Sequence, residues 1–221
     1  MRRIVYENGL SLGFVGLFVL CAIGQTVMGQ RTYNDDREVH GQPRLSYAQY
    51  LRTGHCLEAF AENWESEFLQ MGVFVLLTAF LRQKGSPASK PFAGEEAVDR
   101  DPRQVAPHPD APWPVRRGGI MLTLYSHSLT LVLLLLFAGC FGLHAVGGAW
   151  EYSAEQVAHG GAPVSVVAYV GTASFWFESL QNWQSEFLSL AVMIVLAIVL
   201  RQRGSPESKP VDHPHRETGR A

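Results

Sequence analysis

Two copies of a short polar motif bring ionisable side chains into otherwise apolar segments of this chain. The motif reads N-W-E-S-E-F-L at 63–69 and N-W-Q-S-E-F-L at 182–188. On a helix, side chains three and four residues apart share one face, so the amide, hydroxyl and carboxylate groups of each copy gather together. The candidate polar or ion site consists of Asn63, Ser66, Glu67, Asn182, Ser185 and Glu186.

Three kinds of chemistry are open to the glutamates of this motif. They can accept backbone N–H bonds and tie loops to helix ends, which is a structural role. They can meet and bind a proton or cation, as in a transporter, channel or sensor, because two close carboxylates raise one of their pKa values. They can act as acid and base at the outer leaflet together with His40 and His159. We expect a non-catalytic structural or interaction role, since no nucleophile motif, metal set or phosphate loop accompanies them.

Further polar candidates stand in the segments that precede these motifs. They are Tyr33, His40, Tyr152 and His159. Two histidines without a clear third ligand make a poor zinc site, so we expect loop hydrogen bonds, no metal and no cofactor. Gln25 and His144 occupy matching positions near the outer ends of two apolar runs and could face one vestibule.

The chain contains an internal repeat. Positions 6–91 align with 125–210 without a gap, and 31 of the 86 pairs are identical. We expect repeat 1 at 6–91, a flexible cytoplasmic linker at 92–118, repeat 2 at 119–210 and a disordered tail at 211–221. Positions that are identical in the two copies while the positions around them differ are candidates for a role that both copies share.

Long apolar runs predict membrane spans. Only 17 % of the residues are charged, and about twenty helical residues cross a bilayer core. We expect an all-α membrane protein with four transmembrane helices in a tandem parallel two-helix repeat, at about 8–29, 58–83, 120–147 and 175–202. A secretory signal peptide is the alternative for the first run, but its second copy lies mid-chain, which favours a retained span.

Basic residues predict the orientation. Four of the 18 Lys and Arg residues lie between the first and second spans, none between the third and fourth, and the rest outside these loops. The positive-inside rule then puts both termini in the cytoplasm of a bacterial cell, in a multi-pass inner-membrane protein. The expected interface anchors are Trp64, Arg82, Trp183 and Arg201. The bilayer is the expected partner, with a second copy or another membrane protein open; no basic folded face suggests nucleic acid.

Local signals place the shorter elements. Ser46 and Ser165 precede short aromatic-aliphatic runs and predict the N-caps of an interfacial helix in each outer loop. Each second span ends in R-Q-[KR]-G-S-P, a typical helix stop, because glycine takes the left-handed cap and proline cannot continue the helix. Small residues in the first and third spans suggest close helix contacts at Gly9, Gly13, Gly16, Gly24, Ala138, Gly139 and Gly142.

These motifs resemble a known family: uncharacterised bacterial multi-pass membrane proteins that carry N-W-Q-S-E-F-L followed by L-R-Q-[KR]-G-S-x-E-S-K-P. The resemblance covers the chain from Tyr6 to Pro210. The first copy departs from the pattern at Glu65 and Ala88, where the second has Gln184 and Glu207. The resemblance implies a membrane location and no particular activity.

Overall fold

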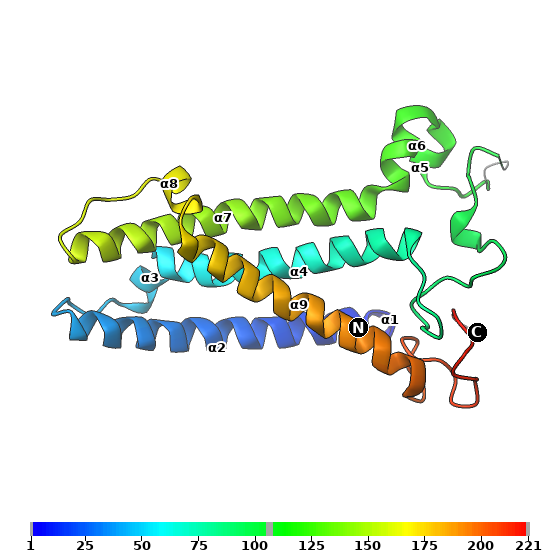
Figure 1. Cartoon of the computed structure of the whole chain (residues 1–221), viewed down its shortest axis with the longest axis horizontal. Helices are drawn as coiled ribbons and strands as arrows, with labels where there is room; N and C mark the ends of the chain where they lie inside the picture. The colour runs from blue at the N-terminus through cyan, green and yellow to red at the C-terminus, as the bar shows by residue number, and fades with distance from the viewer. Residues whose placement is uncertain (1, 105–107, 220–221) are drawn as a thin grey trace. The chain divides into compact units, whose positions relative to one another are not determined.

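The computed structural model describes residues 2–104 and 108–219, and within these ranges the chain forms helices and no strand. Four helices are long (Figure 1): α2 (Gly9–Val39), α4 (Gly54–Phe80), α7 (Ser128–Ala158) and α9 (Ala173–Val199). The short ones are α1 (Arg2–Glu7), α3 (Tyr47–Tyr50), the 3-10 helix η1 (Ala97–Asp99), α5 (Trp113–Arg117), α6 (Gly119–Ser126) and α8 (Val166–Val170). Positions 105–107 of the expected linker and 220–221 of the expected tail lie outside the described residues.

Three of the helices, α2, α7 and α9, are long and apolar enough to cross a membrane. The expected all-helical class is therefore confirmed for the described residues, and three of the four expected spans have the length and composition of membrane helices. Helix α4 has the same length as α9, 27 residues, but carries four glutamates where α9 carries two. These acids are concentrated in its first half and leave its second half apolar.

The described chain divides into two compact units. The first comprises the residues up to Ala61 together with Leu143–Thr172, and the second comprises Glu62–Gly142 together with the residues from Ala173 onward. The first unit holds α1, α2, α3, α8, the start of α4 and the end of α7. The second holds α5, α6, α9 and the remainder of α4 and α7. Each unit contains residues from both halves of the chain.

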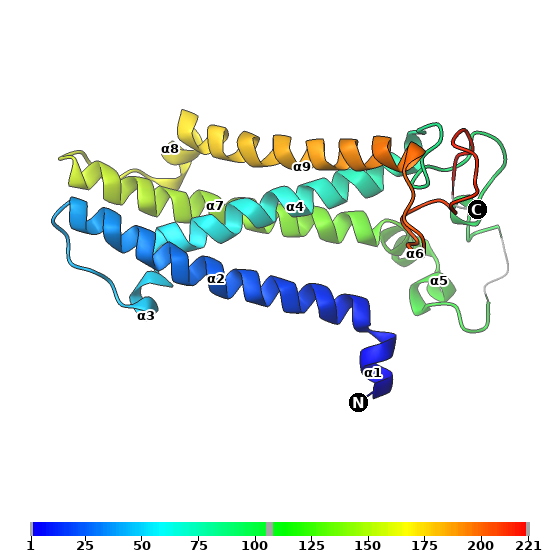
Figure 2. The same ribbon diagram turned by 90° about the horizontal axis from the view of Figure 1, so that it is seen from below.

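In the first unit, the segment after α2 folds back on that helix. Asn34 holds it at both backbone groups of Leu45: its Oδ1 accepts from the Leu45 N–H at 2.7 Å, and its Nδ2 donates to the Leu45 carbonyl at 2.9 Å. Tyr50, at the end of α3, then lies against Gly29 of α2, where a Cβ would collide with its hydroxyl. Figure 2 shows α3 beside α2, and α1 joined to α2 through a bend at Asn8.

The segment after α7, also in the first unit, folds back in the same way. The Ser153 hydroxyl donates to the Val164 carbonyl and accepts from the Val164 N–H, both at 2.9 Å. Helix α8 begins after Ser165, whose Oγ accepts from the Ala168 N–H at 3.2 Å. Tyr169 of α8 ends against α7, with 1 % of its surface exposed. Helices α2 and α7 thus continue past their expected ends, 29 and 147, because these side chains support the extra turns.

In the second unit, α4 and α9 end in turns with the same hydrogen bonds. Gly85 and Gly204 have φ of 82° and 84°, the left-handed conformation that glycine tolerates. The Ser89 hydroxyl accepts from the Gln83 N–H at 2.9 Å. At 2.9 Å as well, the Ser208 hydroxyl accepts from the Gln202 N–H. The R-Q-[KR]-G-S-P-x-S segment is therefore an ordered turn in both places.

The residues after the second turn fold around one ammonium group. Lys209 Nζ donates to the carbonyls of Pro214, His215 and Glu217 at 3.3, 3.0 and 3.0 Å. Up to Gly219, the stretch for which we expect disorder consists of turns around this group.

The glycines singled out from the sequence make no close contacts. A Cβ at Gly9, Gly13, Gly16, Gly24, Gly139 or Gly142 would have no neighbour within 4 Å in the described structure. The close approaches occur elsewhere. A Cβ on Gly54 would lie 2.6 Å from the Gly147 carbonyl oxygen, so the backbones of α4 and α7 meet there in the first unit. The two copies share the close approaches of Gly29 and Gly148 to their tyrosines, but not the crossing at Gly54 and Gly147, which have no glycine in the other copy.

Candidate functional site

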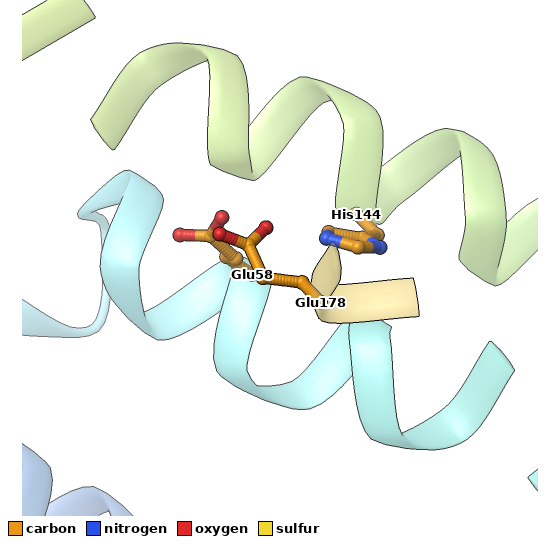
Figure 3. Close-up of side chains that lie close together, drawn as sticks. All are labelled: Glu58, His144 and Glu178. Carbon is orange, nitrogen blue, oxygen red and sulfur yellow. The ribbon is translucent and has the colours of Figure 1, made fainter. Parts of the chain in front are cut away.

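The contact between α4 and α7 in the first unit places an acid beside a histidine. A Cβ on Gly147 would lie 2.8 Å from the backbone nitrogen of Glu58, so this crossing leaves room for no side chain. Glu58 extends from α4 and His144 from α7, one turn before the crossing (Figure 3). A carboxylate oxygen of Glu58 and a ring nitrogen of His144 lie within 4.8 Å of each other. Glu178, the third side chain labelled in the figure, belongs to α9 and to the second unit.

Tyr169 completes this pair. Its hydroxyl donates a hydrogen bond to Oε1 of Glu58 at 3.0 Å. Gly148 lies beneath both groups, and a Cβ there would collide with Glu58 Oε1 and with the Tyr169 hydroxyl oxygen. His144 has no exposed surface, and Tyr169 has 1 %. Glu58 is half-buried, so the cluster joins a partly exposed carboxylate to a fully buried imidazole and a fully buried tyrosine.

Proton exchange is a chemistry open to a carboxylate and an imidazole at this distance. A carboxylate and an imidazole can hold one shared proton, and imidazole changes charge near physiological pH. Ionisable side chains inside an apolar helical segment carry a large desolvation penalty, so they mark functional positions by default.

A second polar cluster of the first unit surrounds His55, which precedes the expected span 58–83. The Tyr50 hydroxyl and His55 Nδ1 are 3.2 Å apart, and the rings of Tyr33 and His55 have centroids 4.9 Å apart. Burial lowers the pKa of the His55 imidazole below its usual 6.5. Burial, followed by the influence of Cys56, raises the pKa of Tyr50 to about 12. Burial therefore favours the neutral form of the His55 imidazole.

The sequence-predicted loop residues partly gather around a pocket of about 180 Å³ in the first unit. Tyr33, His40 and His159 line it, with the acids Asp36, Glu151 and Glu155. The rings of His40 and His159 have centroids 6.2 Å apart. Each Nδ1 lies 2.9 Å from the backbone carbonyl four residues earlier, so both imidazoles bond to their own helices. Tyr152 does not line this pocket; its ring packs on Tyr169 at 5.6 Å.

The candidate ion-site residues lie in the second unit, with mixed surroundings. Glu67 is exposed and Glu186 is half-buried. The hydroxyls of Ser66 and Ser185 each donate to the carbonyl three residues earlier, that of Asn63 or Asn182, at 2.8 Å. Both serine hydroxyls thus bond within their own helices.

Glu65 lies between these residues in the chain and is a buried carboxylate that the sequence did not single out. Glu65 has no exposed surface, and the Trp183 Nε1–H donates to its Oε1 at 3.0 Å. Trp183 also packs on Phe137 and Phe141, with centroids 5.9 and 6.4 Å away. Trp64, the other expected anchor, is 38 % exposed. The two tryptophans thus differ in their surroundings.

The basic residues after α4 and α9 also differ. Arg201 donates to the carbonyls of Pro210 and His213, at 3.2 and 3.1 Å, and to carbonyls at the end of α9. Arg82 makes one long hydrogen bond, from Nη1 to the Leu81 carbonyl at 3.4 Å. Only one of the two expected anchors is therefore engaged by the chain that follows it.

The sequence reasoning missed Glu58 and Tyr169 as partners and had only a weak signal for His144. It searched for positions on which the two copies agree, and Glu58 faces Phe177 in the alignment while His144 faces Gln25. The usable signal was a difference between the copies: an ionisable residue stands at a position where the other copy has an uncharged one.

Comparison with known proteins adds a family but no activity. No curated protein matches the chain significantly, and no solved structure does. A family model described as a domain of unknown function, DUF6766, matches residues 1–220, which confirms the expected membership of an uncharacterised family. The chain belongs to the DUF6766 family.

Proposed function

We propose that this chain is a four-span protein of the bacterial inner membrane, built by tandem duplication at 6–91 and 119–210, with cytoplasmic termini. Helix α4 would be the fourth span beside α2, α7 and α9, and its 27 residues correspond to about 40 Å, more than a bilayer core. Its glutamates lie in its first half and leave an apolar run from Phe68 to Leu81.

Matching hydrogen bonds in both copies support the duplication. The Thr53 hydroxyl donates to the Tyr50 carbonyl at 2.7 Å, and the Thr172 hydroxyl donates to the Tyr169 carbonyl at 2.7 Å. The same correspondence relates the two loop braces and the two helix-stop turns described above.

Contacts between equivalent residues support a parallel arrangement with a pseudo-two-fold axis. In the first unit, His40 packs against His159, its equivalent in the alignment, edge to face. In the second unit, Gln70 Nε2 donates at 3.1 Å to the hydroxyl of its equivalent, Ser189. A residue that touches its own counterpart lies on or near a two-fold axis.

For the activity, we propose proton-linked transport that uses the Glu58–His144 pair. The observation that carries this proposal is the complete burial of His144 beside a carboxylate that accepts from Tyr169. A buried imidazole with a carboxylate neighbour is the usual means by which a membrane protein takes up and releases a proton. The proposal replaces the glutamate pair of the N-W-x-S-E-F-L motifs with a pair on α4 and α7.

Proton uptake by vesicles that contain the purified full chain tests this proposal. An internal pH-sensitive dye should report uptake driven by an imposed membrane potential, and Glu58→Gln and His144→Gln should each reduce the rate at least tenfold. Glutamine is the residue that the first copy has at the position of His144. The exposed Glu155→Gln is the control and should leave the rate unchanged. Wild-type vesicles no more permeable than protein-free vesicles would rule out proton transport.

A structural or interaction role is the second candidate. The hydrogen bonds of Gln70 to the Glu186 carbonyl at 2.7 Å and of Trp183 to Glu65 favour it, because they tie α4 to α9 within the second unit. Under this alternative, Glu58→Gln would lower the melting temperature of the protein without any change in proton permeability.

A further inference from the structure

A groove in the second unit lies between one face of α4 and one face of α9. Its volume is about 310 Å³. From α4 it is lined by Val73, Phe74, Leu77 and Leu81, and from α9 by Phe187, Leu190, Ala191 and Ile194. Both sets follow the helical spacing of three and four residues, so each helix presents one continuous apolar stripe to the groove.

The groove has one polar end. Arg82, Gln83, Ser86 and Ser89 line it there, and all four belong to the turn that ends α4. Arg82 is exposed there, whereas Ser86 is 1 % exposed and its hydroxyl accepts from the Ala88 N–H at 3.2 Å. The turn therefore offers one guanidinium donor at the mouth of an apolar groove.

Arg82 is the charge that the groove supplies. In the part of the chain that the structure describes, the Arg82 guanidinium forms no ion pair. Its charge helps to lower the pKa of Asp99, but the Asp99 carboxylate forms its ion pair with Lys90. The equivalent Arg201 is occupied by the carbonyls of the chain that follows α9. Only the first of the two turns thus keeps its guanidinium available for an external anion.

The same lining recurs in the second copy. A second groove of the second unit is lined by α9 and its turn at Ser189, Val192, Met193, Leu196, Ala197, Leu200, Arg201, Gln202, Ser205, Glu207 and Ser208. Each of these positions is the alignment equivalent of a residue that lines the first groove from α4 and its turn. This groove lacks a wall from a second helix, and Glu207 stands in it where the first has Ala88. An anion is therefore disfavoured in the second groove and favoured in the first.

The length of the first groove fits one leaflet. Gln70 lines its far end and Arg82 its mouth, which are twelve residues apart and hence about 18 Å along α4. Half of a bilayer core is about 15 Å thick. An acyl chain whose headgroup lies level with Arg82 would end near Gln70.

We propose that this groove binds one anionic phospholipid from the leaflet on the side of the Arg82 turn. One acyl chain occupies the stripe between α4 and α9, and the phosphate accepts hydrogen bonds from the Arg82 guanidinium. Basic pockets between membrane helices select anionic headgroups because few water molecules screen the charge. This inference rests on the proposed membrane crossing of α4 and does not depend on the Glu58–His144 pair.

Lipid retention by the purified full chain tests the proposal. Native mass spectrometry in detergent should show one tightly held lipid when phosphatidylglycerol is added, and about tenfold weaker retention of phosphatidylcholine. Both lipids carry the phosphate, but the choline ammonium cancels its charge and is repelled by the Arg82 guanidinium. Arg82→Gln should remove the preference for phosphatidylglycerol. Arg201→Gln is the matched control and should keep it. An unaltered preference in Arg82→Gln, or equal retention of the two lipids by the wild type, would overturn the proposal.

A second variant tests the acyl-chain part without touching the charge. Ala191→Trp should fill the groove and lower retention of both lipids, whereas Ala197→Trp, in the second groove, should not. If Ala191→Trp retains the lipid as the wild type does, the chain does not occupy this groove. The lipid measurement needs no proton flux, so its failure is distinguishable from a failure of the transport proposal.

Discussion

The indole N–H of Trp183 donates a hydrogen bond to Oε1 of Glu65, 3.0 Å away, and thereby joins α9 to α4 within the second unit. Glu65 is fully buried, so the loss of this donor leaves a desolvated carboxylate with weaker compensation. We expect Trp183→Phe to lower the free energy of unfolding by about 1–3 kcal/mol. Thermal unfolding in detergent measures the change. Trp64→Phe, at the equivalent exposed position, is the control; equal effects of the two substitutions would contradict the assigned role.

Gly148 leaves the space that Glu58 and Tyr169 occupy. Gly148→Ala should force both side chains to shift, because its Cβ would overlap Glu58 Oε1 and the Tyr169 hydroxyl oxygen. Overpacking of this kind costs about 1–3 kcal/mol. Gly139→Ala on the same helix meets nothing within 4 Å and should be neutral or stabilising, since alanine is the better helix former. Melting temperatures that change in the same direction for both variants would argue against the tight site.

The lowered pKa of His55 predicts that the stability of the first unit depends on pH. Its pKa in the folded protein lies below 6.5, so the unfolded chain binds the proton more readily. The stabilisation from neutral His55 is therefore complete above about pH 6.5 and declines as the pH falls toward the lowered pKa. The protection factors of the α3 amides, which correct for the intrinsic pH dependence of exchange, should fall over that range. His55→Ser, which installs the residue of the second copy, should flatten the profile; an unchanged profile would dismiss His55 as the titrating group.

Much of this architecture is readable from the sequence, and the reasons are local. The apolar runs of α2, α7 and α9 have the length and composition of spans, and Ser46 and Ser165 mark the starts of α3 and α8 because an N-cap depends on neighbouring residues only. Gly85 and Gly204 take the predicted left-handed conformation for the same reason.

The site was less accessible from the sequence, because its members are distant in the chain. The hydrogen bond between Glu58 and Tyr169 links residues 111 positions apart. The contact depends on the close approach at Gly54 and Gly147, and neither glycine has a glycine in the other copy. A search for agreement between the copies therefore favoured Glu67 and passed over both Glu58 and the buried Glu65.

Lys209 holds the residues after the second turn, through three carbonyls. Lys209→Gln should release them, because an amide offers fewer donors than an ammonium and no charge. Limited digestion with trypsin should then cleave after Arg216 faster than in the wild type. The matched control is Lys90→Gln, since Lys90 occupies the equivalent position and pairs with Asp99 instead. Equal rates in the wild type and in Lys209→Gln would show that the ammonium does not restrain this segment.

The central claim is that the Glu58–His144 pair binds a proton, and infrared difference spectroscopy of the full chain in lipid tests it most directly. A step from neutral to acidic pH should produce the carbonyl band of a protonated carboxylic acid in a buried environment. The account predicts that Glu58→Gln removes this band and that His144→Gln shifts the pH at which it forms, while Glu67→Gln leaves it unchanged. A band that persists in Glu58→Gln, or that disappears in Glu67→Gln, would contradict the account.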